Sequence, residues 1–272
     1  MAIRSATMNV MIGAAKKAAR GLVRDFGELE NLQVSKKGPS DFVSAADIRA
    51  EQVIKAELMK ARPKFSFMME ESGTEEREDT KRRWIVDPLD GTTNFLHGIP
   101  HFAISMALEE FDEITAALVY NPVLDELYTA EKGGGAFMND RRLRVSGRRE
   151  LSDSLFATGI PFQGKGGHAR FVTQLAAVMA KTSGVRRIGA AALDLAYVAS
   201  GRVDGYWEEG LSPWDCAAGI LLVREAGGYV TTPDEVGNPV HKGNVVAANT
   251  HLHPQLMELI RTTKEAEAVQ GA

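Results

Sequence analysis

The sequence predicts a layered α+β fold, and two observations lead to that prediction. Helical and strand-like patterns come in blocks along the chain and do not alternate strictly, which favours separate layers over a doubly wound sheet. The 272 residues are 44% hydrophobic and 25% charged, which is ample material for a sizeable core. Since no internal repeat or low-complexity linker interrupts the chain, we expect one compact unit or two tightly packed halves.

The first quarter of the chain predicts two helices with a loop between them. Residues 7–26 carry an apolar pattern interrupted by basic residues, which is typical of an amphipathic helix and not of a signal peptide. The polar stretch Ser35–Ser40 predicts a loop. Residues 45–61 place apolar side chains at helical spacing, and Pro63 ends that second helix.

Short strands follow, and the first two end in acidic residues. Phe65–Met69 is apolar and runs directly into Glu70, while Arg83–Asp87 ends in an aspartate. Three further strand-like runs are separated by turn residues, and they predict an antiparallel sheet over residues 103–109, 114–120 and 126–130.

Helices and strands are both expected in the second half of the chain. The helical patterns cover 168–181, 191–200, a segment from Pro213 to the Gly227–Gly228 pair, and a last helix ending near Thr263. The strand patterns cover 185–188, 205–208 and 245–248. The tail, 264–272, is expected to fray.

Charge, cysteine content and hydropathy exclude several classes of protein. A net charge of −4 provides no electrostatic footprint for nucleic acid. Cys216 is the one cysteine, so no disulfide forms within the chain, which suits a reducing compartment. No stretch approaches the roughly 20 apolar residues of a membrane-spanning helix. The sequence therefore predicts a cytoplasmic protein that binds neither nucleic acid directly nor a membrane.

The segment Asp87–Phe95 holds the strongest chemical signal. Asp87 and Asp90 are separated by a proline and a leucine, and two carboxylates at this spacing can converge at a strand end as ligands for Mg²⁺. Gly91 allows close backbone approach, and its amide and that of Thr92 would bind an anion if they open a helix. A tight surface turn capped by aspartates explains the same spacing, so this motif alone leaves both interpretations open.

Two other acids have both an ordinary and a functional explanation. Glu70 follows an apolar strand, where a solvated strand end would account for it. Asp215 begins an apolar helix, where the helix dipole favours an acid. Together, these two acids favour the metal-site interpretation of the aspartate pair over the turn interpretation.

The chain resembles the inositol monophosphatase family, most of all its bacterial inositol-1-monophosphatases. The resemblance is carried, in order, by Asp41–Asp47, Glu70–Gly73, Asp87–Phe95, Arg187–Tyr197 with Gly201–Gly205, and Trp214–Gly219. It extends from about Lys36 to Gly228. The departures are small, because Ser44 stands where threonine is usual and Met68–Met69 replaces a small or apolar pair.

The resemblance implies a fold and an assembly. The implied fold is the layered αβαβα sandwich of the sugar phosphatases, usually a homodimer. We expect a single catalytic unit over 1–272, with an N-terminal α+β half (about 1–145), a C-terminal α/β half (about 146–263) and the tail.

The resemblance also implies roles for individual residues. The implied metal ligands are Glu70, Asp87, Asp90, Asp215 and the carbonyl of Leu89. The implied substrate-binding residues are Gly91 and Thr92 for the phosphate, Gly189, Ala191 and Glu208 for the sugar hydroxyls, and Asp215. Lys36 falls in the loop that closes over the metals in this family.

The activity implied is Mg²⁺-dependent hydrolysis of a phosphate monoester, with inositol 1-phosphate as the expected substrate and inhibition by lithium. Glu70 and the Thr92 hydroxyl would orient the attacking water beside Asp90, and Asp47 would accept a hydrogen bond from Thr92. Fructose 1,6-bisphosphate, histidinol phosphate and 3′-phosphonucleotides remain alternative substrates. A binding role with the transcription machinery is a further alternative, because the bacterial branch includes members of that kind.

Overall fold

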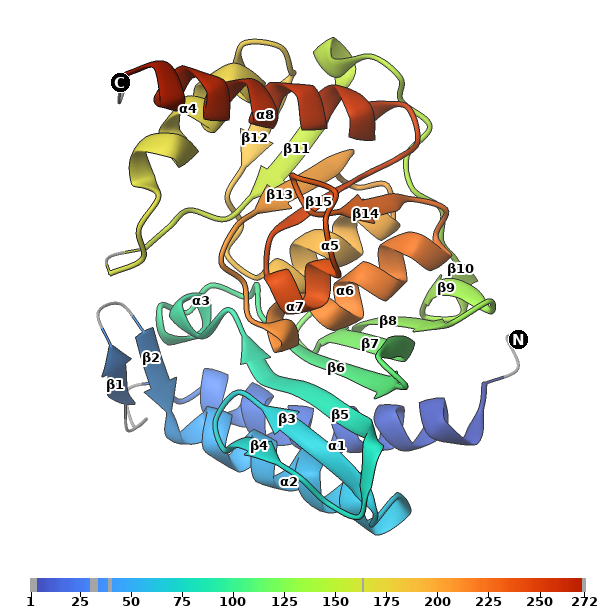
Figure 1. The fold of residues 1–272 in the computed structure, drawn as a ribbon. Helices are drawn as coiled ribbons and strands as arrows, with labels where there is room; N and C mark the ends of the chain where they lie inside the picture. The colour runs from blue at the N-terminus through green and yellow to red at the C-terminus, as the bar shows by residue number, and fades with distance from the viewer. Residues whose placement is uncertain (1–3, 30–33, 39–40, 163, 271–272) are drawn as a thin grey trace.

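Five layers stack in the order helices, sheet, helices, sheet, helices, which confirms the predicted αβαβα arrangement (Figure 1). This computed structural model describes residues 4–29, 34–38, 41–162 and 164–270, without the side chains of 34–38, 41–43 and 262–270. No helix in these described ranges is long and apolar enough to cross a membrane.

The larger sheet has eight strands in the order β10-β9-β8-β7-β6-β5-β3-β4. Its pairs are antiparallel except that β3 runs parallel to β5, which confirms the predicted antiparallel pairing of the central strands. The strands are β3 (Phe65–Met69), β4 (Gly73–Glu75), β5 (Asp79–Asp90), β6 (Ala103–Glu110), β7 (Glu113–Asn121), β8 (Glu126–Glu131), β9 (Gly135–Met138) and β10 (Arg141–Arg142).

The smaller sheet has five strands in the order β12-β11-β13-β15-β14. Strand β11 pairs in parallel with β12 and β13, whereas β15 is antiparallel to both of its neighbours. The strands are β11 (Leu155–Thr158), β12 (Gly184–Arg186), β13 (Gly205–Glu208), β14 (Tyr229–Thr231) and β15 (Val245–Ala248).

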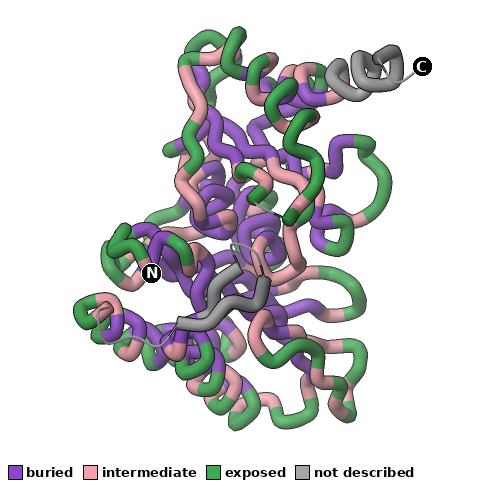
Figure 2. Tube along the Cα trace, turned by 90° about the vertical axis from the view of Figure 1, so that its left-hand side faces the viewer, coloured by how far each residue is buried: buried purple, intermediate pink, exposed green. Residues whose placement is uncertain are grey.

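Three pairs of helices cover the faces of the two sheets. Helices α1 (Ala6–Phe26) and α2 (Ala45–Ala61) cover the outer face of the larger sheet. Helices α5 (Ala191–Ala199) and α6 (Pro213–Glu225) lie between the sheets. Helices α4 (His168–Met179) and α8 (Leu252–Gln270) cover the smaller sheet from outside. Each pair of helices packs in an apolar cluster of its own, and the central cluster reaches both sheets. Buried segments of the chain are seen in every layer (Figure 2).

Two sequence predictions were wrong. The stretch predicted as a loop over Ser35–Ser40 instead contributes β1 (Val34–Gly38), which pairs antiparallel with β2 (Asp41–Ser44); residues 39–40 lie outside the described ranges. The polar composition of this stretch favours a loop, but backbone hydrogen bonds to the neighbouring strand stabilise the extended conformation. The tail predicted to fray continues α8 through Gln270, since its lysine, glutamate and alanine residues are good helix formers.

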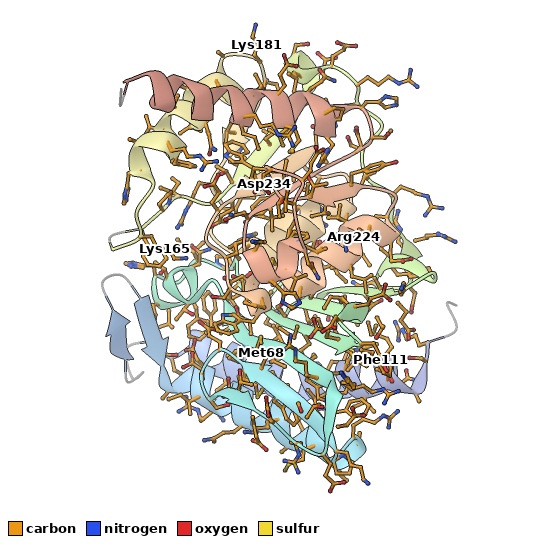
Figure 3. The ribbon with its side chains drawn as sticks, in the orientation of Figure 1. Met68, Phe111, Lys165, Lys181, Arg224 and Asp234 are labelled. Carbon is orange, nitrogen blue, oxygen red and sulfur yellow. The ribbon has the colours of Figure 1, made fainter. Side chains whose placement is uncertain are left out.

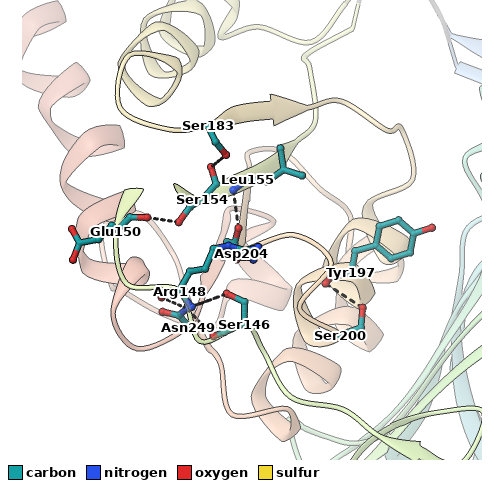
Figure 4. A network of polar contacts seen from close by, with 10 residues as sticks. All are labelled: Ser146, Arg148, Glu150, Ser154, Leu155, Ser183, Tyr197, Ser200, Asp204 and Asn249. Carbon is teal, nitrogen blue, oxygen red and sulfur yellow. Dashed lines mark hydrogen bonds and ion pairs between the residues drawn. The ribbon is translucent and has the colours of Figure 1, made fainter. Parts of the chain in front are cut away.

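A network of polar contacts anchors the segment that leads from the larger sheet to the smaller one (Figure 4). The Asp204 carboxylate is 2% exposed and accepts hydrogen bonds from the Leu155 amide at 2.7 Å and from the Arg148 guanidinium at 3.0 Å. The Asn249 side chain donates to the carbonyls of Ser146 and Arg148. The start of β11 is therefore held by Asp204, and the segment that precedes it is held by Asn249.

We expect Asp204→Ala to lower the free energy of unfolding by about 2–4 kcal/mol, because it leaves the Leu155 amide without its acceptor. Urea denaturation would measure the change. Arg148→Ala is the matched comparison, since that side chain is 52% exposed and its loss should cost less than about 1 kcal/mol. Equal losses in the two variants would contradict this assignment.

Candidate active site

The end of strand β5 places two aspartates on the same face of the larger sheet. Asp87 pairs with Ser105 and Asp90 with Ala103, so β5 carries one more residue than β6 across this interval. Residues three apart on a regular strand point to opposite faces, but the extra residue of a β-bulge restores the same face. Pro88 suits the bulge, because it has no amide to offer to the ladder.

A left-handed glycine turns the chain from this strand into the short helix α3 (Thr92–Leu96). Gly91 has φ +90°, and a Cβ there would lie 3.0 Å from the carbonyl oxygen of His101. The Thr92 hydroxyl then lies 3.0 Å from the Leu89 carbonyl oxygen and 3.1 Å from Asp47 Oδ1. The turn thus brings the Thr92 hydroxyl close to both the Leu89 carbonyl and the buried carboxylate of Asp47.

Asp47 is held at the start of α2. It is fully buried and accepts hydrogen bonds from both the amide and the hydroxyl of Ser44, which caps the helix. Burial raises the pKa of Asp47, and the hydrogen bonds from Ser44 and Thr92 oppose that rise. The predicted hydrogen bond from Thr92 to Asp47 is present in the structure.

Glu70 and Asp215 reach the same region from two other elements. Glu70 directly follows β3, and its amide donates to the Val86 carbonyl of the neighbouring strand β5. Asp215 is the third residue of α6, where its Oδ2 accepts a hydrogen bond from the Ser212 amide at 2.7 Å. Strand pairing and a helix capping box therefore set their positions.

A cavity of about 190 Å³ collects most of the predicted site residues. Its lining includes Glu70, Asp90, Gly91, Thr92, Gly189, Ala191, Glu208 and Asp215. The remaining predicted residues, Asp47, Asp87 and Leu89, are buried next to this lining. The side chain of Lys36 lies outside the described part of the chain.

The four predicted carboxylate ligands interact electrostatically with one another in one cluster. Burial raises the pKa of Asp87 well above its usual value, and the charges of Glu70, Asp90 and Asp215 raise it further. Burial likewise raises the pKa of Asp90, with Asp215 as the next largest cause. Four acids in one buried site therefore resist ionising together unless a cation compensates their charge.

These oxygen donors suit Mg²⁺, and they would supply part of its coordination shell instead of all six ligands. Within the described ranges, no three His, Cys, Asp or Glu side chains already converge as a metal-binding group. Mg²⁺ is usually held by one or two carboxylates, with waters and substrate phosphate oxygens completing its octahedron. Carboxylates beside an open cavity suit that mode of binding.

Glu208 lines the same cavity as the phosphate motif. A Cβ on Gly159 would lie 1.9 Å from its carboxylate, so only glycine admits Glu208 in this position. Its Oε2 accepts a short hydrogen bond from the Tyr206 hydroxyl. Burial raises the pKa of Glu208 to about 7, the Tyr206 hydrogen bond opposes that shift, and the charge of Asp215 adds to it.

Several lining residues were not identified from the sequence. Asp194, Arg187 and Lys165 also line the cavity, and Figure 3 shows Lys165 at the same edge of the molecule as α3. The sequence could have identified Asp194 as a site residue, because it is an acid in the otherwise apolar run of helix α5. No sequence pattern identifies Lys165, since it lies in a glycine-rich loop without helical or strand periodicity.

Comparisons with known proteins agree with this geometry. The model of the inositol monophosphatase family matches residues 4–266. An inositol-1-monophosphatase of Mesorhizobium japonicum is 60% identical over 258 residues, covering 95% of this chain and 97% of that protein. The Nus factor SuhB of Pseudomonas aeruginosa is 43% identical, covering 93% of this chain and 95% of that protein.

A solved structure extends the similarity to three dimensions. The extragenic suppressor protein suhB of Bartonella henselae has a TM-score of 0.92 and 58% sequence identity, covering 94% of this chain and 98% of that one. The similarity in sequence and in structure spans nearly the whole chain. This chain belongs to the inositol monophosphatase family.

Proposed function

We propose that this protein hydrolyses inositol 1-phosphate to inositol and phosphate, with Mg²⁺ as its cofactor and water as the nucleophile. The observation that carries the proposal is the group of four mutually interacting carboxylates, from three separate segments, beside one cavity. The relatives named as inositol-1-monophosphatases support the choice of substrate. A homodimer in the cytoplasm is part of the same proposal.

The residues of the chain have separate tasks in this reaction. Glu70, Asp87, Asp90, Asp215 and the Leu89 carbonyl would hold Mg²⁺. When bound, Mg²⁺ lowers the pKa of a bound water and neutralises charge on the leaving oxygen. Glu70 and the Thr92 hydroxyl orient the water, and Asp47 fixes the Thr92 hydroxyl through their hydrogen bond. The backbone at Gly91 and Thr92 binds the phosphate, because Gly91 leaves that approach free of a side chain.

The other end of the cavity would receive the inositol ring. Gly189 and Ala191 add no bulk, and Glu208 presents a carboxyl group to a hydroxyl. The Asn94 amide, which donates to the carbonyls of His101 and Ile188, fixes the loop that carries Gly189. A polyol phosphate is therefore expected to bind with its phosphate at α3 and its hydroxyls at α5 and β13.

A phosphate-release screen would test the proposal. The substrates are inositol 1-phosphate, fructose 1,6-bisphosphate, histidinol phosphate and 3′-phosphoadenosine 5′-phosphate, each with and without Mg²⁺ and Li⁺. We expect the highest kcat/KM for inositol 1-phosphate, only with Mg²⁺, and inhibition by Li⁺. A higher kcat/KM for another substrate would overturn the substrate assignment, and full activity in a chelator would overturn the metal assignment.

The stabilisation by Mg²⁺ should depend on pH. The pKa values of Asp87 and Asp90 are raised in the folded protein. Without metal, the neutral forms of these two acids therefore stabilise the fold at low pH. That contribution to the free energy of unfolding is lost as the pH rises through the raised pKa values. Mg²⁺ needs the ionised forms. The rise in Tm caused by a fixed Mg²⁺ concentration should therefore shrink as the pH is lowered. Melting curves from about pH 8.5 to 5.5 would measure it, and a rise independent of pH would contradict it.

A second role in transcription is favoured by one observation. The relatives named Nus factor SuhB share 43% identity or slightly less with this chain over most of its length. The proposed role is a partner surface that acts independently of catalysis. A growth phenotype of a deletion strain that Asp90→Asn restores as well as wild type would support it. Restoration by wild type alone would restrict the role to catalysis.

A further inference from the structure

One buried acid at the cavity has no task in the reaction described above. Asp194 is 1% exposed and lies in the first turn of α5, one turn beyond Ala190, whose carbonyl accepts its amide hydrogen bond at 2.9 Å. Its side chain lines the cavity together with Ala191 and Glu208. It therefore shares the cavity with two residues that are expected to contact the ring hydroxyls.

One oxygen of the Asp194 carboxyl group has no hydrogen-bond partner within the described residues. This atom, Oδ1, is enclosed. Buried polar atoms are nearly always hydrogen-bonded, and leaving one unpaired costs about 1–3 kcal/mol. The other buried residues of α5 are apolar, so packing alone would be served better by an apolar side chain. An uncompensated acid in this position is explained by a partner that arrives with the ligand.

The surroundings of Asp194 indicate what that partner is. The charged groups that act on it are the acids Asp90 and Glu208 and the cation Arg187. Burial, followed by these two acids, raises its pKa well above the usual value, and Arg187 opposes the rise. A carboxyl oxygen accepts a hydrogen bond from a hydroxyl whether or not the carboxyl group is ionised. A second phosphate would be repelled by these acids, whereas a hydroxyl of a polyol would be bound.

We propose that Asp194 is a specificity-determining residue, which binds a ring hydroxyl of the substrate opposite Glu208 and selects polyol phosphates over phosphates with apolar leaving groups. This inference rests on the proposed function and adds to it a second hydroxyl-binding group. The ordinary alternative is an acid that only stabilises the N-terminus of α5. The two explanations differ in which substrates are affected by its removal.

The test compares Asp194→Ala with wild type on inositol 1-phosphate and on cyclohexyl phosphate, which has a ring of the same size without hydroxyls. We expect kcat/KM for inositol 1-phosphate to fall about tenfold or more, and kcat/KM for cyclohexyl phosphate to change less than about twofold. Asp194→Asn should restore part of the selectivity, since the oxygen of the asparagine amide also accepts a hydrogen bond. The rise in Tm with Mg²⁺ should be the same in both variants as in wild type.

Asp112→Asn is the matched control, because Asp112 is exposed and its φ of 64° is one that asparagine also adopts. A series of monodeoxy inositol 1-phosphates then identifies the hydroxyl, since one analogue should no longer distinguish Asp194→Ala from wild type. Equal losses on inositol 1-phosphate and cyclohexyl phosphate, or a lost Mg²⁺ effect on Tm, would overturn the inference. If the proposed function is wrong, wild type itself releases no phosphate from inositol 1-phosphate, and the inference about Asp194 is then overturned as well. This result differs from the first one, in which wild type is active and the two substrates lose equally in Asp194→Ala.

Discussion

Asp90→Asn is expected to lower kcat for inositol 1-phosphate by about 1,000-fold, equivalent to about 4 kcal/mol of transition-state stabilisation. Asp90 is the acid on which Asp215, Glu70 and Glu208 all act, so its charge is central to the proposed metal site. The Ala192 amide donates to Asp90 Oδ2 at 2.8 Å, and an asparagine oxygen can accept the same bond. The substitution therefore removes the charge while it keeps the local geometry.

The same variant should separate metal binding from folding. Without Mg²⁺, its Tm should equal or exceed that of wild type, because one of four repelling acids is gone. With Mg²⁺, most of the rise in Tm seen for wild type should disappear. Differential scanning calorimetry with and without Mg²⁺ measures both, and the exposed Asp153→Asn is the control. A rise in Tm as large as that of wild type would remove Asp90 from the ligand set.

Gly159→Ala is expected to lower kcat/KM for inositol 1-phosphate by about 100-fold, the second largest effect, equivalent to about 2.7 kcal/mol. A Cβ at this position would lie 1.9 Å from the Glu208 carboxylate, so Glu208 must leave its site beside Tyr206. The backbone of residue 159 is not in the left-handed region, and alanine adds no strain of its own. The loss should therefore come from the displaced carboxyl group and not from unfolding.

A double-variant comparison tests that explanation. Once Glu208 is shortened by Glu208→Ala, adding Gly159→Ala should cost little more, because the colliding atoms are gone. Gly147→Ala is the control, since a Cβ there meets nothing within 4 Å. The measurements are kcat/KM and Tm of all four proteins. Additive losses in the double variant would show that Gly159 acts independently of Glu208.

Local sequence patterns predicted most of the elements of the fold. Strands over 205–208 and 245–248 lie where apolar runs between turn residues indicated them. Helix α6 begins at Pro213 and ends shortly before the Gly227–Gly228 pair, as the preference for proline at helix starts and glycine after helix ends indicated. These features depend on neighbours in the chain, so a window of residues contains the necessary information.

Patterns failed where the structure depends on distant partners. The hairpin of β1 and β2 reads as a polar loop, because strand pairing and not composition forms it. The bulge at Pro88 is invisible in the motif, although it alone puts Asp87 and Asp90 on the same face. For the same reason, the turn interpretation of that motif could not be excluded from its spacing.

By itself, the sequence determined the order of helices and strands, the family resemblance, and which acids to consider. Only the tertiary structure decided that Glu70, Asp90, Asp215 and Glu208 share a cavity and that the other three acids raise the pKa of Asp90. It also decided that Asp194 is buried beside them with one carboxyl oxygen lacking a hydrogen-bond partner among the described residues. The physical reason is that electrostatic coupling and desolvation depend on distances between side chains. Sheet order and layer packing set those distances for residues that lie more than a hundred positions apart in the chain.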